Sequence, residues 1–288
     1  MHGRLRELLR GNFIRHGLRN KAIRVVREAV QPGHDEQQAE LHRLRDEVAH
    51  LHEELNKLTG EQADRAQRVL DRLLAYEIRA RRDIVYAADQ TAARDSAALV
   101  HEQMLTAERF PDPYRTLEYA LSQASGSGMA LEFGVYSGTT LKMISDTLAG
   151  HDVYGFDSFE GLPEAWRTGF DAGHFNVDTL PDVGSAELVV GWFDETLPGF
   201  LTQHPGPPVA FLHIDSDLYS SARTVLDLVG SRLEPGSIVV FDEYFNFPSW
   251  QRHEYRAWQE HVERTGLEYS YLAYTYNNEQ VVIRIDAV

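Results

Sequence analysis

Two apolar segments of the chain end in carboxylates that could bind a metal ion. Phe211-Leu-His-Ile-Asp215 and Ile238-Val-Val-Phe-Asp242 each resemble a buried strand, and Asp217 and Glu243 follow closely behind them. If these strands are neighbours in a sheet, their ends lie about 5 Å apart. Carboxylates this close repel one another unless a cation lies between them, and Mg²⁺ prefers oxygen ligands. We therefore expect a Mg²⁺ site, at which a bound hydroxyl would lose its proton more readily.

The same aspartates have a simpler explanation, which is that each caps the helix after its strand. Aspartate is favoured at helix N-termini because its side chain accepts hydrogen bonds from free N–H groups. For Asp217 alone the two interpretations are balanced. For the whole cluster of carboxylates we favour the metal site.

A glycine-containing turn farther upstream is typical of a nucleotide-binding site. The apolar run Met129-Ala-Leu-Glu-Phe leads into Gly134-Val-Tyr-Ser-Gly138, and a helix is expected from about Thr139. Glycine lets a strand turn sharply into a helix, whose free N–H groups then face the ligand. Asp157 ends the next expected strand, where a carboxylate can accept hydrogen bonds from both ribose hydroxyls.

The details of this turn favour a cofactor without phosphate groups. Tyr136 stands where the dinucleotide fingerprint has its middle glycine, so a pyrophosphate would be crowded. S-adenosylmethionine (SAM) has no phosphate, and Glu132 would supply negative charge near its ammonium and sulfonium groups. We expect SAM to contact the following residues: Glu132, Gly134, Tyr136, Ser137, Gly138, Asp157, Ser158 and Trp192.

Alternating strands and helices are expected to position these residues. The strands are expected near residues 129–134, 152–157, 186–190, 208–214 and 237–242, with a final pair near 268–274 and 279–286. Strands that alternate with helices indicate a parallel sheet, and the last two indicate an antiparallel hairpin at its edge. We assign residues 113–288 to this α/β domain, and the long segment from Ser158 to Val183 is a candidate lid over the site.

Residues 34–112 are expected to be helical. Apolar residues recur there at spacings of three and four, as in the seam of a short coiled coil, and Gly60 is expected to end that helix. Self-association into a homo-oligomer is modestly favoured over an intramolecular helical hairpin. The seam consists of Leu41, Leu44, Val48, Leu51, Leu55 and Leu58.

Charge and composition narrow the possible partners. Residues 1–33 form a basic amphipathic segment, in which residues 1–30 hold eight Lys/Arg and two Asp/Glu, while the whole chain has a net charge of −16. An acidic body repels nucleic acid. We expect the basic segment to pack against protein, with peripheral contact to an anionic membrane surface as the alternative. The chain has no cysteine and no apolar run long enough to span a bilayer, so we expect a soluble, cytoplasmic protein.

Five sequence blocks in one order resemble a known family. They are Leu131-Glu-Phe-Gly-Val-Tyr-Ser-Gly-Thr-Thr140, Gly155-Phe-Asp-Ser-Phe-Glu-Gly-Leu-Pro-Glu164, Gly191-Trp-Phe-Asp-Glu-Thr-Leu-Pro198, His213-Ile-Asp-Ser-Asp-Leu-Tyr219 and Phe241-Asp-Glu-Tyr244. Together, over roughly residues 115–286, they are similar to the macrocin O-methyltransferase (TylF-like) family of class I SAM-dependent methyltransferases. The resemblance implies a seven-stranded Rossmann-like α/β fold, here with an N-terminal helical and coiled-coil extension.

The resemblance also implies roles for individual residues. Asp215, Asp242 and Glu243 would bind Mg²⁺, which receives neighbouring hydroxyls of an acceptor sugar, and Asp217 would accept the proton. This chain has Asp242-Glu243 where antibiotic-tailoring members of the family have two aspartates, so the second ligand has a longer side chain. His253 is a candidate auxiliary base, weighed against an ordinary surface histidine.

The expected function is therefore transfer of the SAM methyl group to a hydroxyl of a sugar, in a natural product, a glycan or a glycolipid. Three alternatives remain open at this point. A catechol-like phenol could also chelate the metal, and the helical region could make the chain a non-catalytic binding module. An NAD(P)-dependent oxidoreductase is disfavoured by Tyr136 and by the lack of a Tyr-x-x-x-Lys pair.

Overall fold

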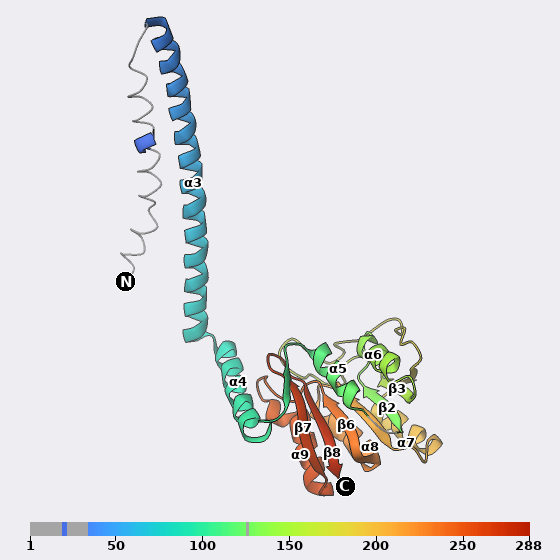
Figure 1. Ribbon diagram of the computed structural model, residues 1–288. Helices are drawn as coiled ribbons and strands as arrows, with labels where there is room; N and C mark the ends of the chain where they lie inside the picture. Colours follow the sequence, from blue (N-terminus) through green and yellow to red (C-terminus); the bar gives the residue numbers. More distant parts are fainter. Residues whose placement is uncertain (1–18, 22–33, 125–126) are drawn as a thin grey trace. The chain divides into compact units, whose positions relative to one another are not determined.

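The computed structural model describes residues 19–21, 34–124 and 127–288 (Figure 1). The chain divides after Ile84 into two compact units. Residues 19–21 are helical, and the rest of the basic segment 1–33 lies outside the described residues, together with the membrane contact considered for it. None of the helices in the described ranges is both long and apolar enough to cross a membrane.

The first unit contains one long helix, α3 (His34–Arg82). Helix formation across the seam is confirmed, with Leu44 buried and Leu51 and Leu55 partly buried. The expectation that the helix ends at Gly60 is wrong, because α3 continues through this position. An exposed glycine inside a helix costs only about 1 kcal/mol relative to alanine, and the strong helix formers on both sides offset that cost.

The second unit begins inside the segment that the sequence assigned to the helical extension. Its first helix is α4 (Ile84–Gln103), whose Ala92 and Leu99 belong to the same apolar core as the sheet. The next elements are β1 (Glu108–Phe110), α5 (Pro113–Gln123), β2 (Met129–Phe133), α6 (Thr139–Thr147), β3 (Asp152–Asp157), β4 (Glu187–Val190) and α7 (Phe193–Gln203). They are followed by β5 (Val209–Ile214), α8 (Tyr219–Val229), β6 (Leu233–Phe241), α9 (Glu254–Thr265), β7 (Glu268–Thr275) and β8 (Val281–Ala287).

These strands form one eight-stranded sheet in the order β1-β7-β8-β6-β5-β2-β3-β4. All neighbouring pairs are parallel except the two that involve β8, which confirms the Rossmann-like α/β fold class with its C-terminal hairpin. The hairpin does not form the edge, because β1 pairs with β7 and adds an eighth strand to the expected seven. With three residues, β1 is too short to show the alternation by which a strand is recognised in a sequence.

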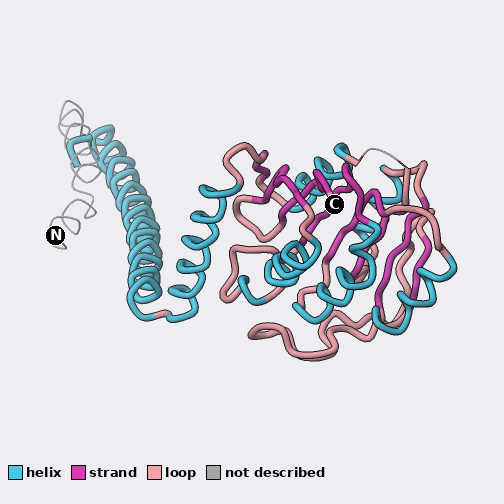
Figure 2. The backbone as a smooth tube through the Cα atoms, turned by 90° about the horizontal axis from the view of Figure 1, so that it is seen from below, coloured by secondary structure: helices cyan, strands magenta, loops and turns pink. Residues whose placement is uncertain are grey.

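Helices cover both faces of the sheet (Figure 2). On one face, α5 and α6 pack against residues such as Ala130, Phe211 and Val240. On the other face, α4, α7, α8 and α9 pack against residues such as Phe133, Leu212 and Phe241. Successive residues of a strand point to opposite faces, so every polar side chain of the central strands is assigned to one of these two layers.

Candidate active site

The two predicted strand ends lie side by side at the carboxyl edge of the sheet. Strands β5 and β6 are neighbours, with Ile214 paired to Phe241. The Asp215 N–H donates to the carbonyl oxygen of Phe133 over 2.9 Å, and the Asp242 N–H donates to that of Ile214 over 2.9 Å. Both aspartates therefore keep the register of the strands that they follow. Their carboxylates and a ring nitrogen of His213 provide three ligand atoms that lie within 4.8 Å of one another.

The carboxylates of this edge carry unfavourable electrostatics without a cation. Burial, together with the charges of Asp242 and Asp217, raises the pKa of Asp215 well above its usual value. Burial and the charges of Asp217 and Asp242 do the same to the pKa of Glu243. Burial and the charge of Asp242 raise the pKa of Asp217 to about 7, although Arg167 acts in the opposite direction. Such mutual repulsion is what a bound divalent ion would relieve.

His213 connects this edge to Glu132 on the neighbouring strand. Glu132 and His213 are paired in register across β2 and β5, and Nδ1 of His213 lies 2.8 Å from Oε1 of Glu132. Both side chains are fully buried. Burial alone would lower the pKa of His213, but the hydrogen bond to Glu132 and the charges of Glu132 and Asp242 outweigh it and raise that pKa.

Glu254, the first residue of α9, holds the two acidic loops together. Its Oε1 accepts a hydrogen bond from the Ser216 N–H over 3.3 Å, and its Oε2 accepts one from the Glu243 N–H over 3.1 Å. The side chain is completely buried. A single carboxylate thus ties the loop after β5 to the loop after β6, and so fixes the spacing between Asp215 and Asp242.

Replacing Glu254 by alanine is expected to destabilise the protein. The change leaves two buried N–H groups without an acceptor, at a cost of about 1–3 kcal/mol each. Chemical denaturation followed by circular dichroism should therefore show a free energy of unfolding lower by about 2–6 kcal/mol. The matched control is Glu263→Ala, an exposed position on the same helix, which should change this free energy by less than about 0.5 kcal/mol. Equal stability of the two variants would contradict the bridging role of Glu254.

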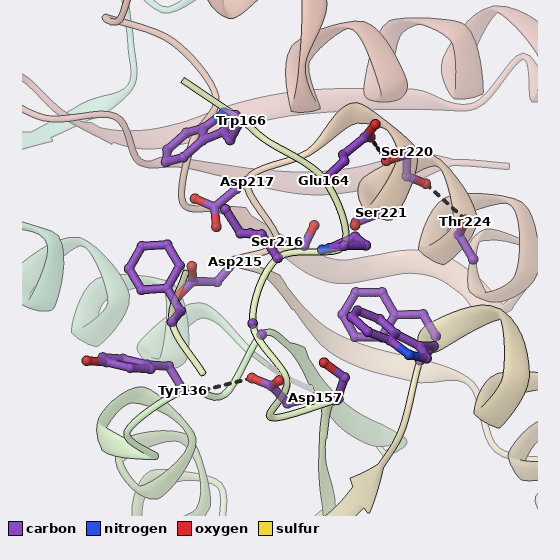
Figure 3. A pocket seen from close by; sticks show the side chains of 18 of the residues that line it. Tyr136, Asp157, Glu164, Trp166, Asp215, Ser216, Asp217, Ser220, Ser221 and Thr224 are labelled. Atoms are coloured by element: carbon purple, nitrogen blue, oxygen red, sulfur yellow. Dashed lines mark hydrogen bonds between the residues drawn. The ribbon is translucent and has the colours of Figure 1, made fainter. Parts of the chain in front are cut away.

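The loop after β2 is shaped by Asp157 at the end of β3. One carboxylate oxygen of Asp157 accepts hydrogen bonds from the N–H groups of Val135 and Tyr136 over 2.8 and 2.9 Å, and the other accepts one from Phe159 over 2.7 Å. Figure 3 shows the bond between Tyr136 and Asp157. Gly134 has a φ of +94°, and a Cβ atom there would lie 1.7 Å from the carbonyl oxygen of Asp215. Only glycine allows this approach, which brings the β2 loop against the acidic edge.

A cavity of about 790 Å³ opens over this loop and the acidic edge. Residues of the Ser158–Val183 segment form much of its wall, including Arg167 and Trp166. Figure 3 shows the position of Trp166. The row of hydroxyls from Ser220, Ser221 and Thr224 on α8 lies along another side. Of the residues expected from the sequence, the lining includes Gly134, Tyr136, Asp157, Ser158, Trp192, Asp215, Asp217, Asp242 and Glu243.

Four expected site residues do not line this cavity. Glu132 is buried against His213, and Gly138 begins α6 with a φ of +78°. Ser137 lies 3.0 Å from the Thr139 hydroxyl. His253 packs against the rings of Trp166 and Phe247, with centroid distances of 6.5 and 5.5 Å. The roles expected for His253 as an auxiliary base and for Glu132 as a negative charge near SAM therefore stay predictions.

A second, smaller cavity of about 310 Å³ meets the first at the acidic edge. Asp215, Asp242, Glu243 and Arg167 line both cavities. The remaining lining residues of the smaller cavity come from the start of α5, the start of α6, the central strands and the turn before β8. They are Pro113, Tyr114, Leu117, Thr140, His213, Val240, Asn278, Glu279 and Gln280.

Arg167 ties the wall of the larger cavity to this turn. Its Nη1 donates to both oxygens of Glu279, over 3.0 and 3.3 Å, and its guanidinium lies 3.8 Å from the ring centroid of Trp166. His213, Arg167, Glu254 and Glu279 were all missed in the sequence analysis. Only His213 had a signal there, because it lies inside the strand that ends at Asp215.

Comparisons with known proteins agree with this geometry. Residues 131–244 match a family model described as a methyltransferase domain, and these residues hold both the β2 loop and the acidic edge. This part of the second unit is therefore similar to a methyltransferase domain, which is the class of domain that the sequence motifs indicated.

Two curated relatives are named as O-methyltransferases. The chain is 27% identical over 156 residues to the 8-demethyl-8-(2,3-dimethoxy-alpha-L-rhamnosyl)-tetracenomycin-C 4'-O-methyltransferase of Streptomyces olivaceus, an alignment that covers 44% of this chain and 58% of that protein. It is 26% identical over 159 residues to the demethyldecarbamoylnovobiocin O-methyltransferase of Streptomyces niveus, covering 45% and 58%. The chain thus spans less than two thirds of these relatives. The crystal structure of CalS11, a calicheamicin methyltransferase, matches with 24% identity and a TM-score of 0.49 over 59% of this chain and 77% of that one.

Proposed function

We propose that this protein is a Mg²⁺-dependent O-methyltransferase that transfers the methyl group of SAM to a hydroxyl of a sugar. One observation carries the proposal: the carboxylates of Asp215 and Asp242, from adjacent strands, lie where two cavities meet. A donor in one cavity and an acceptor in the other would then approach each other beside a metal-binding edge.

The larger cavity suits the donor. Its lining brings together the β2 loop, the Asp157 carboxylate and the aromatic side chains of Trp192 and Phe193. These groups can hold a methionine moiety, a ribose and an adenine in turn. Asp157 already accepts three backbone hydrogen bonds, so it would shape the loop as well as contact the ribose. When bound, SAM supplies the electrophilic methyl group.

The smaller cavity suits an uncharged acceptor. Four carboxylates line it, and its arginine is paired with Glu279 while its histidine is paired with Glu132. Among the described residues of this lining no cation is left to hold a phosphate or carboxylate group. The amides of Asn278 and Gln280 can instead form hydrogen bonds with hydroxyls, and Oε1 of Gln280 is buried without a partner.

The residues at the junction fit a divalent cation and a proton acceptor. Asp215, Asp242 and Glu243 offer oxygen ligands, and Oε2 of Glu243 is buried without a hydrogen-bond partner. A bound divalent ion lowers the pKa of a hydroxyl that it contacts. Asp217 lines the larger cavity beside these residues, and its carboxylate can accept the proton of the hydroxyl.

The curated relatives favour a sugar as acceptor, since the tetracenomycin enzyme's name specifies a rhamnosyl compound. We propose an acceptor of this kind, a neutral glycoside within a natural product or glycan.

We also propose that the chain forms a homo-oligomer through the heptad seam of α3.

Removing divalent metal is expected to abolish turnover without abolishing SAM binding. The assay measures S-adenosylhomocysteine release with a panel of neutral methyl glycosides that carry adjacent hydroxyls, and with a catechol. EDTA should reduce the rate by at least about 100-fold, and added Mg²⁺ should restore it. Calorimetry should give a SAM affinity that changes less than about threefold, because the donor contacts are separate from the cation. Full turnover in EDTA would contradict the metal requirement, and turnover of the catechol alone would contradict the sugar acceptor.

A further inference from the structure

His213 lies in a buried arrangement that is typical of a metal-binding histidine. Its Nδ1 is 2.8 Å from Glu132, and a hydrogen on Nδ1 leaves the lone pair of Nε2 directed away from Glu132. Nε2 lies 4.0 Å from Oδ1 of Asp242, beyond hydrogen-bond distance, and the ring lines the smaller cavity. Apart from this cavity wall, His213 is enclosed by protein and is only 1% exposed.

The groups around Nε2 of His213 are mainly potential electron-pair donors. A ring nitrogen of His213 and carboxylate oxygens of Asp215 and Asp242 lie within 4.8 Å of one another, and Nε2 is the nitrogen that lies 4.0 Å from Asp242. Oε2 of Glu243 is a further buried acceptor without a partner beside them. In many metalloproteins a metal-binding histidine donates its other ring N–H to a carboxylate. His213 and Glu132 match this carboxylate–histidine–metal pattern.

We propose that Nε2 of His213 is a metal ligand together with Asp215 and Asp242, that Glu132 orients it, and that the site therefore binds Mn²⁺ more tightly than Mg²⁺. An imidazole nitrogen suits first-row transition metals, whereas Mg²⁺ takes oxygen ligands almost exclusively. This inference rests on the proposed function, because that function supplies the reason for a metal ion at this site. It adds which atoms of the protein bind the ion. It also gives Glu132 a role in orienting His213, in addition to the negative charge that it would supply near SAM.

Electron spin echo envelope modulation of bound Mn²⁺ tests this directly, because it detects a nitrogen that is bonded to the metal. The full chain without an affinity tag is loaded with one equivalent of Mn²⁺ in the absence of SAM. The wild-type protein should show ¹⁴N modulation, and His213→Gln should lose it and bind Mn²⁺ at least about 10-fold more weakly. Glu132→Gln should keep the ¹⁴N modulation, and its affinity for Mn²⁺ should be lower by about 10-fold or more.

The spectrum of the wild-type protein tests whether a nitrogen binds the metal even if a variant fails to fold. Mn²⁺ bound without ¹⁴N modulation would overturn the His213 assignment and leave a site of carboxylates alone, with the proposed function intact. Modulation that persists in a folded His213→Gln protein would also overturn it, since another nitrogen would then be the ligand. If Mn²⁺ does not bind, both this inference and the metal requirement of the proposed function fail. If Mn²⁺ binds through His213 but no diol is methylated, only the proposed function fails.

Discussion

Asp215→Ala is expected to reduce methyl transfer by about 10³-fold or more, with SAM affinity largely unchanged. Asp215 is at the junction of the two cavities, within reach of Asp242 and His213. Its removal takes away a ligand of the cation that would activate the hydroxyl. The donor contacts at the β2 loop and Asp157 remain. The measurement pairs steady-state turnover with calorimetric titration of SAM, and Asp242→Ala should behave in the same way.

A suitable control is Asp146→Ala, which removes an exposed carboxylate on α6 that lines neither cavity. This variant should keep the wild-type rate within about twofold. Normal turnover by Asp215→Ala would show that the acidic edge does not take part in the chemistry. An equal loss of turnover and of SAM binding would instead assign Asp215 to the donor site.

Asp157→Ala should have the opposite pattern, a loss of SAM affinity of about 10- to 100-fold, or about 1.4–2.8 kcal/mol. The carboxylate accepts three backbone N–H groups, two of them from the loop that would cradle the donor. Without it this loop loses its fixed shape, and a ribose loses its acceptor. Calorimetry of SAM binding, with thermal unfolding to confirm that the variant is folded, measures the effect.

Strand β3 provides the matched control at its other end. Asp152 is exposed and begins the same strand, on the opposite edge of the sheet from both cavities. Asp152→Ala should therefore bind SAM with wild-type affinity. Unchanged affinity in Asp157→Ala would contradict its role in the donor site, because the two variants would then be indistinguishable.

Local patterns in the sequence were sufficient to predict the parallel sheet and the acidic edge. Apolar runs ending in Asp215 and Asp242 locate two strand ends, and parallel strands bring their carboxyl ends to one edge. The glycine at position 134 has a positive φ, which is what a sharp strand-to-helix turn requires. These features depend on residues that are close together in the chain.

The features that escaped prediction depend on pairing between distant segments. Glu132 and His213 meet because β2 and β5 pair in one particular register, which neither segment specifies alone. Glu254 and Glu279 reach the site from α9 and the turn before β8, and nothing in their local sequence indicates the N–H groups or the arginine that they bind. Gly60 was misjudged because helix propensity is a weak signal within a long run of helix formers.

A crystal structure of the protein with Mn²⁺ and S-adenosylhomocysteine, with anomalous diffraction data collected at the manganese absorption edge, examines the metal site and the donor site together. We expect one strong anomalous peak between the carboxylates of Asp215 and Asp242, with the sulfur of the bound product in the larger cavity beside the β2 loop. A peak away from these carboxylates, or a product bound outside the cavity lined by Asp157, would contradict the account.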